Sequence, residues 1–141
     1  MNNIYKILLL IIILTISSCE NGNKTKICSG KLIMPKVDNI NDDYFKLFYN
    51  RIVNNWEPYS GLNHSCTTKL ITVLRKNGDL LMVNIKETTC DYKFNNSCKE
   101  VINKFKNYGK VPFVTREDLL IIPMEFLYKC NNIGATSPNK A

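Results

Sequence analysis

Residues 70–85 read LITVLRKNGDLLMVNI, and the pair Asn77-Gly78 stands between two apolar segments. Asn-Gly is the preferred pair for a two-residue type I′ turn between antiparallel strands. A turn centred there pairs Leu74 with Leu81, Thr72 with Val83, Leu70 with Ile85 and Thr68 with Glu87. In this register one face carries Leu70, Leu74, Leu81, Val83, Ile85 and Cys66. Because a packed sheet needs one coherent apolar face, the stretch predicts a β-hairpin.

The opposite face of this hairpin is mixed. It carries Ile71, Val73 and Met82 among polar residues. A cleanly solvated face would alternate apolar and polar residues strictly. We therefore expect this face to be partly covered, either by the N-terminal segment or by a partner.

A helix is predicted on the N-terminal side of the hairpin. Large apolar residues recur at spacings of three and four, at Phe45, Phe48, Ile52 and Trp56. This is the period of one helix face. The pattern predicts a helix over 42–56, ended by Pro58 and Gly61.

A second helix is predicted after the hairpin. Its apolar face consists of Phe94, Cys98, Val101, Ile102 and Phe105. Ser97 and Glu100 have the spacing of a capping box, in which each side chain bonds the other residue's backbone amide. Gly109 and Pro112 follow the pattern and end the helix.

The last element is predicted to be a strand over 119–130, rich in Leu, Ile, Phe and Tyr. Pro123 lacks a backbone donor, which favours an edge position in the sheet. The order helix, strand, strand, helix, strand predicts an α+β fold. We expect a three-stranded antiparallel sheet with both helices packed on one face.

The N-terminus has the pattern of an export signal. Its apolar run, 7–16, is ten residues long, which suits a signal peptide and is too short to span a bilayer. Ile16-Ser17-Ser18-Cys19 resembles a bacterial lipobox, which implies lipidation of Cys19; a secretory signal with an unmodified Cys19 is the alternative. The predicted plan is a signal peptide over 1–18, a lipid anchor and polar tether over 19–40, a folded domain over 41–130 and a flexible tail over 131–141.

Length and charge exclude several classes of protein. A chain of 141 residues with 19 Lys+Arg, 12 Asp+Glu and a net charge of +7 is one ordinary globular domain. It is too short for a multidomain enzyme or a polytopic membrane protein. Export makes a nucleic-acid partner improbable. The cluster of Lys99, Lys104, Lys106 and Lys110 is either a solvated face or a face for an acidic partner or lipid headgroups.

The sequence carries no pattern typical of catalysis. Neither HExxH, GxSxG nor a glycine-rich phosphate loop occurs, and the Cys-x-x-Cys spacing of a zinc site is missing. His64 lies near Cys66 and could form a nucleophilic pair with it. Such a pair needs a free thiolate, whereas cysteines of exported proteins form disulfides. We expect no catalytic residue, no metal and no cofactor.

Across 41–130 the chain resembles the C-terminal domain of TolA, within the TolA/TonB C-terminal superfamily. The resemblance rests on the order of several short motifs rather than on any one of them. These are Ile52, Trp56 and Pro58, then Ser65-Cys66-Thr67, then Gly78-Asp79-Leu80-Leu81, then Asp91 and Cys98. The family pattern implies a disulfide between Cys66 and Cys98.

The resemblance also implies protein binding rather than catalysis. Domains of this family receive extended segments of envelope proteins at a sheet edge, as TolA does with TolB, colicins and filamentous phage coat proteins. The edge is expected on the last strand, with Leu119, Ile121, Met124, Phe126 and Tyr128 as contact residues. The strand over 80–87 is the edge if the strand order differs. A free edge offers backbone groups to a partner strand.

Three points stay open. Cys28, Cys90 and Cys130 allow one further disulfide, and sequence does not choose among the pairings; we favour Cys28–Cys130, which ties the tether to the last strand. Glu20 after the lipidated cysteine favours the periplasmic face of the outer membrane over the inner. The alternative to an adaptor is an immunity, decoy or purely structural lipoprotein that binds colicin or phage proteins.

Overall fold

The computed structural model describes residues 25–34, 42–112 and 118–133. The chain divides into a compact unit, Lys26–Asn131, and a second unit made of Met1–Thr25 and Asn132–Ala141. The predicted signal peptide and Cys19 lie outside the described residues.

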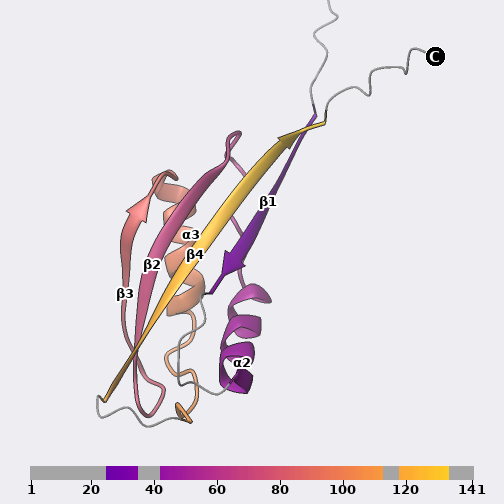
Figure 1. The fold of residues 1–141 in the computed structure, drawn as a ribbon. Helices are drawn as coiled ribbons and strands as arrows, with labels where there is room; N and C mark the ends of the chain where they lie inside the picture. Colours follow the sequence, from indigo (N-terminus) through magenta and orange to yellow (C-terminus); the bar gives the residue numbers. More distant parts are fainter. Residues whose placement is uncertain (1–24, 35–41, 113–117, 134–141) are drawn as a thin grey trace, which may run out of the picture. The chain divides into compact units, whose positions relative to one another are not determined.

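The compact unit contains a four-stranded antiparallel sheet and two helices (Figure 1). Its elements, in chain order, are β1 (Lys26–Ile33), α2 (Asp42–Val53), β2 (Cys66–Arg75), β3 (Leu80–Thr88), α3 (Tyr92–Asn103) and β4 (Leu119–Asn132). The strand order is β1-β4-β2-β3. The predictions of an α+β class and an antiparallel sheet with two helices are confirmed, but the sheet has four strands instead of three.

The strand missed by the sequence is β1. Residues 26–33 were expected to belong to a polar tether, because Lys, Ser and Gly make up half of them and no regular apolar alternation is present. They form a strand because two of their side chains, Cys28 and Leu32, pack toward the core. Leu32 is buried and Cys28 is bonded to β4. Gly30 also faces inward, and only a residue without a side chain fits there, because a Cβ would lie 2.7–2.8 Å from side-chain atoms of Pro58 and Trp56.

β4 is an interior strand, which corrects its predicted edge position. It pairs with β2 along Leu119–Tyr128 and has β1 on its other side. Cys28 and Cys130 lie opposite each other with Cα atoms 4.0 Å apart. Counting from this pair places Ile33, the last residue of β1, opposite Glu125. Pro123 therefore lies beyond the end of β1, where a missing donor costs no bond to that strand.

The hairpin register is confirmed in its middle and wrong at both ends. Leu70 pairs with Ile85 and Thr72 with Val83, as predicted. Two bulges shift the remaining pairs, so Leu74 meets Leu80 and Thr68 meets Thr88. The bulges place an extra β3 residue at each end. Leu81 is consequently exposed, and Leu80 takes its expected inward place.

The hairpin turn is a three-residue loop rather than the predicted two-residue type. Gly78 N donates to Arg75 O at 2.8 Å, and Arg75 N donates to Asp79 O at 2.8 Å. Gly78 has φ +91°, which is typical of the glycine in a loop that ends in a bulge. A Cβ at Gly78 would also collide with the carbonyl of Gly109. The turn is thus shaped by the segment after α3, whose Tyr108 N donates to Gly78 O.

The core lies between one face of the sheet and the two helices. α2 contributes Tyr44, Phe48 and Ile52, and α3 contributes Phe94, Cys98, Val101 and Ile102. The rings of Trp56 and Phe126 meet edge to face at 4.7 Å between centroids. Both helices pack on the same face, as predicted (Figure 1).

α3 begins with a different cap from the one predicted. Asp91 Oδ1 accepts a hydrogen bond from Phe94 N at 2.9 Å. Ser97 lies inside the helix, where its hydroxyl donates to Phe94 O. The capping box predicted at Ser97 and Glu100 is therefore wrong, because the helix starts one and a half turns earlier.

The disulfides correct one prediction and agree with another. Cys66 is bonded to Cys90, and Cys98 is a buried free thiol. The pairing of Cys66 with Cys98 implied by the family resemblance is therefore wrong. Cys90 lies just after β3, and Thr89 N bonds Thr67 O next to Cys66, which brings these two cysteines together. Cys28 is bonded to Cys130, the pairing favoured from the sequence.

Candidate functional site

The residues predicted to contact a partner on β4 do not form an edge. Met124, Phe126 and Tyr128 are buried in the core beneath the helices. Leu119 and Ile121 point to the opposite face of the sheet and are exposed. Alternation along the strand separates the two groups. The prediction that β4 is an edge strand is wrong over its C-terminal half, where β1 lies beside it, whereas Leu119 and Ile121 lie beyond the end of β1.

The edge strands of the described sheet are β1 and β3, and β3 is the alternative edge predicted from the sequence. It lies last in the strand order and bonds to β2 on one side only. No other described strand lies beyond it. Most of its residues are exposed, and Val83 and Ile85 are only partly buried. Unpaired N–H and C=O groups on such an edge can receive an added strand.

The start of β3 is closed by the segment that follows α3. Leu80 N donates to Lys106 O at 2.9 Å, and Asp79 forms a bridge with Asn107. The side chains of Asn107 and Asn77 donate hydrogen bonds to the Asp79 carboxylate, and these bonds lower its pKa. The open part of the edge therefore runs from Leu81 to Thr88.

A polar network fixes α3 beside the far end of β3. Asn95 Oδ1 accepts hydrogen bonds from Thr68 Oγ1 at 2.6 Å and from Thr88 Oγ1 at 2.8 Å. Thr68 is fully buried, so this network satisfies a hydroxyl that would otherwise be costly. These three residues were not among the site residues predicted from the sequence. Polar residues at positions within otherwise apolar faces of β2 and α3 could have indicated them.

The sheet face opposite the helices is apolar at one end. Ile121 on β4 is 52% exposed and Met82 on β3 is 44% exposed. At the hairpin end of this face, a cavity of 450 Å³ is lined by Arg75, Lys76, Asn77, Leu81, Asp118 and Leu119. The outer face of the hairpin is mixed, as predicted, but the described part of the N-terminal segment does not cover it: β1 lies beside β4 in the same sheet.

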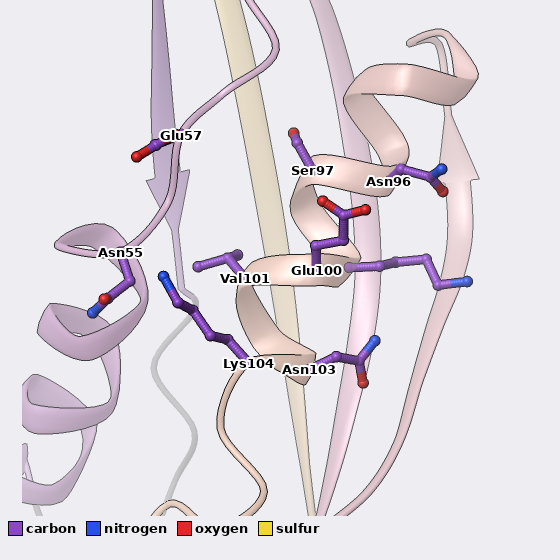
Figure 2. Close-up of a pocket in the computed structure, with 9 residues that line it drawn as sticks. Asn55, Glu57, Asn96, Ser97, Glu100, Val101, Asn103 and Lys104 are labelled. Carbon is purple, nitrogen blue, oxygen red and sulfur yellow. The ribbon is translucent and has the colours of Figure 1, made fainter.

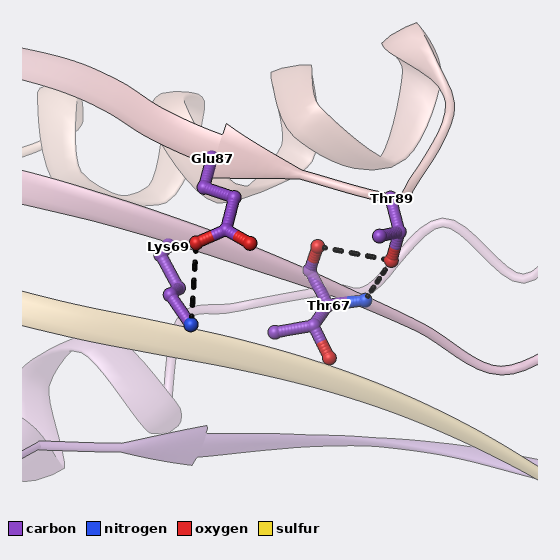
Figure 3. Close-up of polar contacts among 4 residues, drawn as sticks. All are labelled: Thr67, Lys69, Glu87 and Thr89. Carbon is purple, nitrogen blue, oxygen red and sulfur yellow. Dashed lines mark hydrogen bonds and ion pairs between the residues drawn. The ribbon is translucent and has the colours of Figure 1, made fainter.

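The other end of this open face is polar (Figure 3). Lys69 on β2 pairs across the strands with Glu87 on β3 and with Glu125 on β4. Its Nζ lies 3.3 Å from Glu87 Oε2, in the one ion pair found between described residues. Thr89 Oγ1 accepts from Thr67 N beside them. These residues and Glu125 line a cavity of 250 Å³.

A third hollow lies on the outer side of α3 (Figure 2). Its volume is 630 Å³, and it is lined by Asn55, Glu57, Asn96, Ser97, Lys99, Glu100, Val101, Asn103 and Lys104. Lys104 extends toward Asn55 of the segment after α2, whereas Asn96 and Asn103 extend to the other flank of the helix, toward β3 (Figure 2). The lining side chains are mainly amides and charged groups of both signs, without a clustered metal or nucleophilic centre.

The candidate catalytic pair of His64 and Cys66 is not formed. Cys66 forms a disulfide with Cys90 and has no free thiol. The His64 ring is exposed, and its Nδ1 lies 3.2 Å from Asn63 Oδ1. Among the described residues Cys98 is the free thiol, and burial raises its pKa to about 12, so it is protonated at neutral pH and is a poor nucleophile. In the described ranges, no group of three or more His, Cys, Asp or Glu residues is placed to hold a metal ion.

Neither α2 nor α3, the helices within the described residues, has the length and hydropathy needed to span a membrane. Comparisons with protein-family models, curated proteins and solved structures gave no match to this chain.

Proposed function

We propose that this chain is a lipid-anchored adaptor of the bacterial cell envelope that binds an extended segment of a partner protein by strand addition at β3. The proposal combines the lipobox-like Ile16–Cys19 with the resemblance to the TolA C-terminal domain. The anchor would hold the domain at the periplasmic face of a membrane. Binding, rather than catalysis, would be its activity.

The observation that carries the proposal is the one-sided pairing of β3. Leu81–Thr88 bonds to β2 alone among the described strands. Natural sheets usually shorten, cover or charge such an edge. This edge is eight residues long and has bulges at Leu81 and Lys86, so its regular part is Met82–Ile85, which carries no charged residue. An added strand would gain backbone bonds there and contact side chains on both faces.

Site-specific cross-linking in intact cells tests the proposal. A photoreactive phenylalanine analogue replaces Asn84 or Met82 on β3, or Leu47 on α2, which is 68% exposed. We expect one discrete adduct from the two β3 positions and none from Leu47. On isolation of the adduct, amides of β3 should exchange hydrogen more slowly than in the free protein.

Two results would overturn the proposal. Equal adducts from all three positions would indicate random encounter. An absence of adducts from β3, with normal folding of the variants, would exclude an occupied edge. In the same cells, Cys19→Ser and the intact mass of the wild-type chain test the anchor, since a lipidated Cys19 carries acyl chains and the serine variant cannot.

A further inference from the structure

We propose that the segment received by β3 is acidic, and that its carboxylates pair with a row of lysines along this edge, Lys86, Lys99 and Lys106. This inference rests on the proposed function and adds the chemistry of the partner. It follows from the positions of charged groups on β3, on α3 and on the segment after α3.

Lys86 and Lys99 lie along the open edge, and Lys106 lies at its closed start. Lys106 lies at the start of β3, because its carbonyl accepts from Leu80 N. Lys86 belongs to the last third of β3 and is exposed. Lys99 lies between them on α3: Asn95 faces Thr88, and a residue four positions later lies on the same flank of a helix.

The carboxylates on β3 and its flanking segments already have partners. Asp79 accepts from Asn77 and Asn107. Asp91 caps α3 through Phe94 N. Glu87 is paired with Lys69 on the open face. None of the three edge lysines has an ion pair with a described residue, so the edge presents uncompensated positive charge.

Burial adds to the charge argument. An added strand would cover Val83 and Ile85, which are only partly buried, and would lie beside Tyr92, which is 76% exposed on the same flank of α3. Carboxylates on such a strand would be partly shielded from water. Ion pairs at a partly buried interface are stronger than exposed ones and speed association. A neutral segment would leave the positive charge of the lysines uncompensated, and a basic segment would be repelled by it.

Peptide binding tests the inference on the full-length protein. The probe is a fluorescein-labelled nine-residue peptide of alternating Asp and Val, and the reference is the same peptide with Asn in place of Asp. We expect the Asp peptide to bind at least tenfold more tightly, with affinity falling as salt increases. Lys99→Glu should weaken its binding about three- to tenfold.

The matched control is Lys104→Glu, which makes the same charge change on the opposite flank of α3 and should leave binding within twofold. Equal binding of the two peptides, equal effects of Lys99→Glu and Lys104→Glu, or no binding of the Asp peptide would overturn the acidic-partner inference. The β3 cross-links fail only if the proposed function itself is wrong, so the two failures are distinguishable.

Discussion

The two faces of the sheet differ in their covering far more than in their composition. Toward the helices, Phe126 is fully buried; on the opposite face of the same strand, Ile121 is 52% exposed. β2 likewise carries apolar side chains on both faces, with Leu70 under the helices and Val73 on the other side. Val73 is buried between its neighbours Met82 and Ile121, which are themselves exposed, so the helices decide where a continuous core forms. Hydrophobicity along the strands alone does not distinguish the two faces.

The largest expected difference is in the reactivity of a thiol beneath the helices, where Cys98 of α3 lies, and of a thiol on the open face. Cys98 is fully buried and its pKa is raised from 9.0 to about 12 by burial. At pH 8 this lowers the thiolate fraction about a thousandfold. We expect Cys98 to resist iodoacetamide, while an Ile121→Cys variant is labelled rapidly, as measured by mass spectrometry.

The same thiol gives a pH dependence. A folded pKa above the unfolded value stabilises the fold fully below pH 9.0, and this stability is lost as pH rises toward 12. Rapid labelling of Cys98 in the native protein, or labelling of Cys66 or Cys90, would contradict the disulfide arrangement and the burial described above.

The next largest difference is expected in the free energy of unfolding when an apolar side chain on either face is truncated to alanine. Phe126→Ala removes a buried ring that contacts Trp56, and we expect it to lower the free energy of unfolding by about 3–5 kcal/mol. Ile121→Ala, on the open face of the same strand, should cost less than about 1 kcal/mol. Urea unfolding of both variants measures this. Similar losses would mean that the open face is covered in solution.

The N-terminal cap of α3, one of the helices that cover the core, is expected to contribute less to the free energy of unfolding. Asp91→Ala removes the acceptor for Phe94 N, and we expect a loss of about 1 kcal/mol. Asp91→Asn keeps an acceptor oxygen and should retain most of the stability. Thermal unfolding compares the two variants, and an equal loss in both would assign the effect to charge instead of capping.

The smallest effect is expected at the polar end of the open face. Lys69 and Glu87 are both exposed, so water screens their attraction. A double-mutant cycle with Lys69→Ala and Glu87→Ala should give a coupling of about 0.5 kcal/mol. A coupling several times larger would show that this end of the face is shielded, as a bound partner or an ordered cover would make it.

The elements with strong periodicity could be predicted, and the order of the strands could not. The helix containing Phe48 and Ile52 follows from spacing alone, as does the pairing of Leu70 with Ile85. β1 escaped prediction because its inward positions are Cys28, Gly30 and Leu32, and only one of these is a large apolar residue. Its insertion beside β4 made β1, instead of the C-terminal half of β4, the edge on that side of the sheet, while β3 is the edge on the other side.

Local errors had local causes. Asn77-Gly78 marked the turn correctly, but contacts from Gly109 and Tyr108 selected a longer loop. The cysteine partner of Cys66 was inferred from family likeness, whereas Thr67 and Thr89 bring Cys90 to it. The lysines along β3 lie on three separate segments, so only the folded arrangement aligns them.

The disulfide between Cys28 and Cys130 determines how the domain would respond to a pull on its N-terminus. Cys28 is the third residue of β1, and its bond joins that strand covalently to the interior strand β4. A pull on the N-terminal end of β1 would detach at most Lys26 and Ile27 before the load reached the sulfur atoms. The strand therefore cannot be unzipped one hydrogen bond at a time, and force entering from the N-terminus passes directly into the centre of the sheet. Reduction of this bond would transfer that load to hydrogen bonds alone.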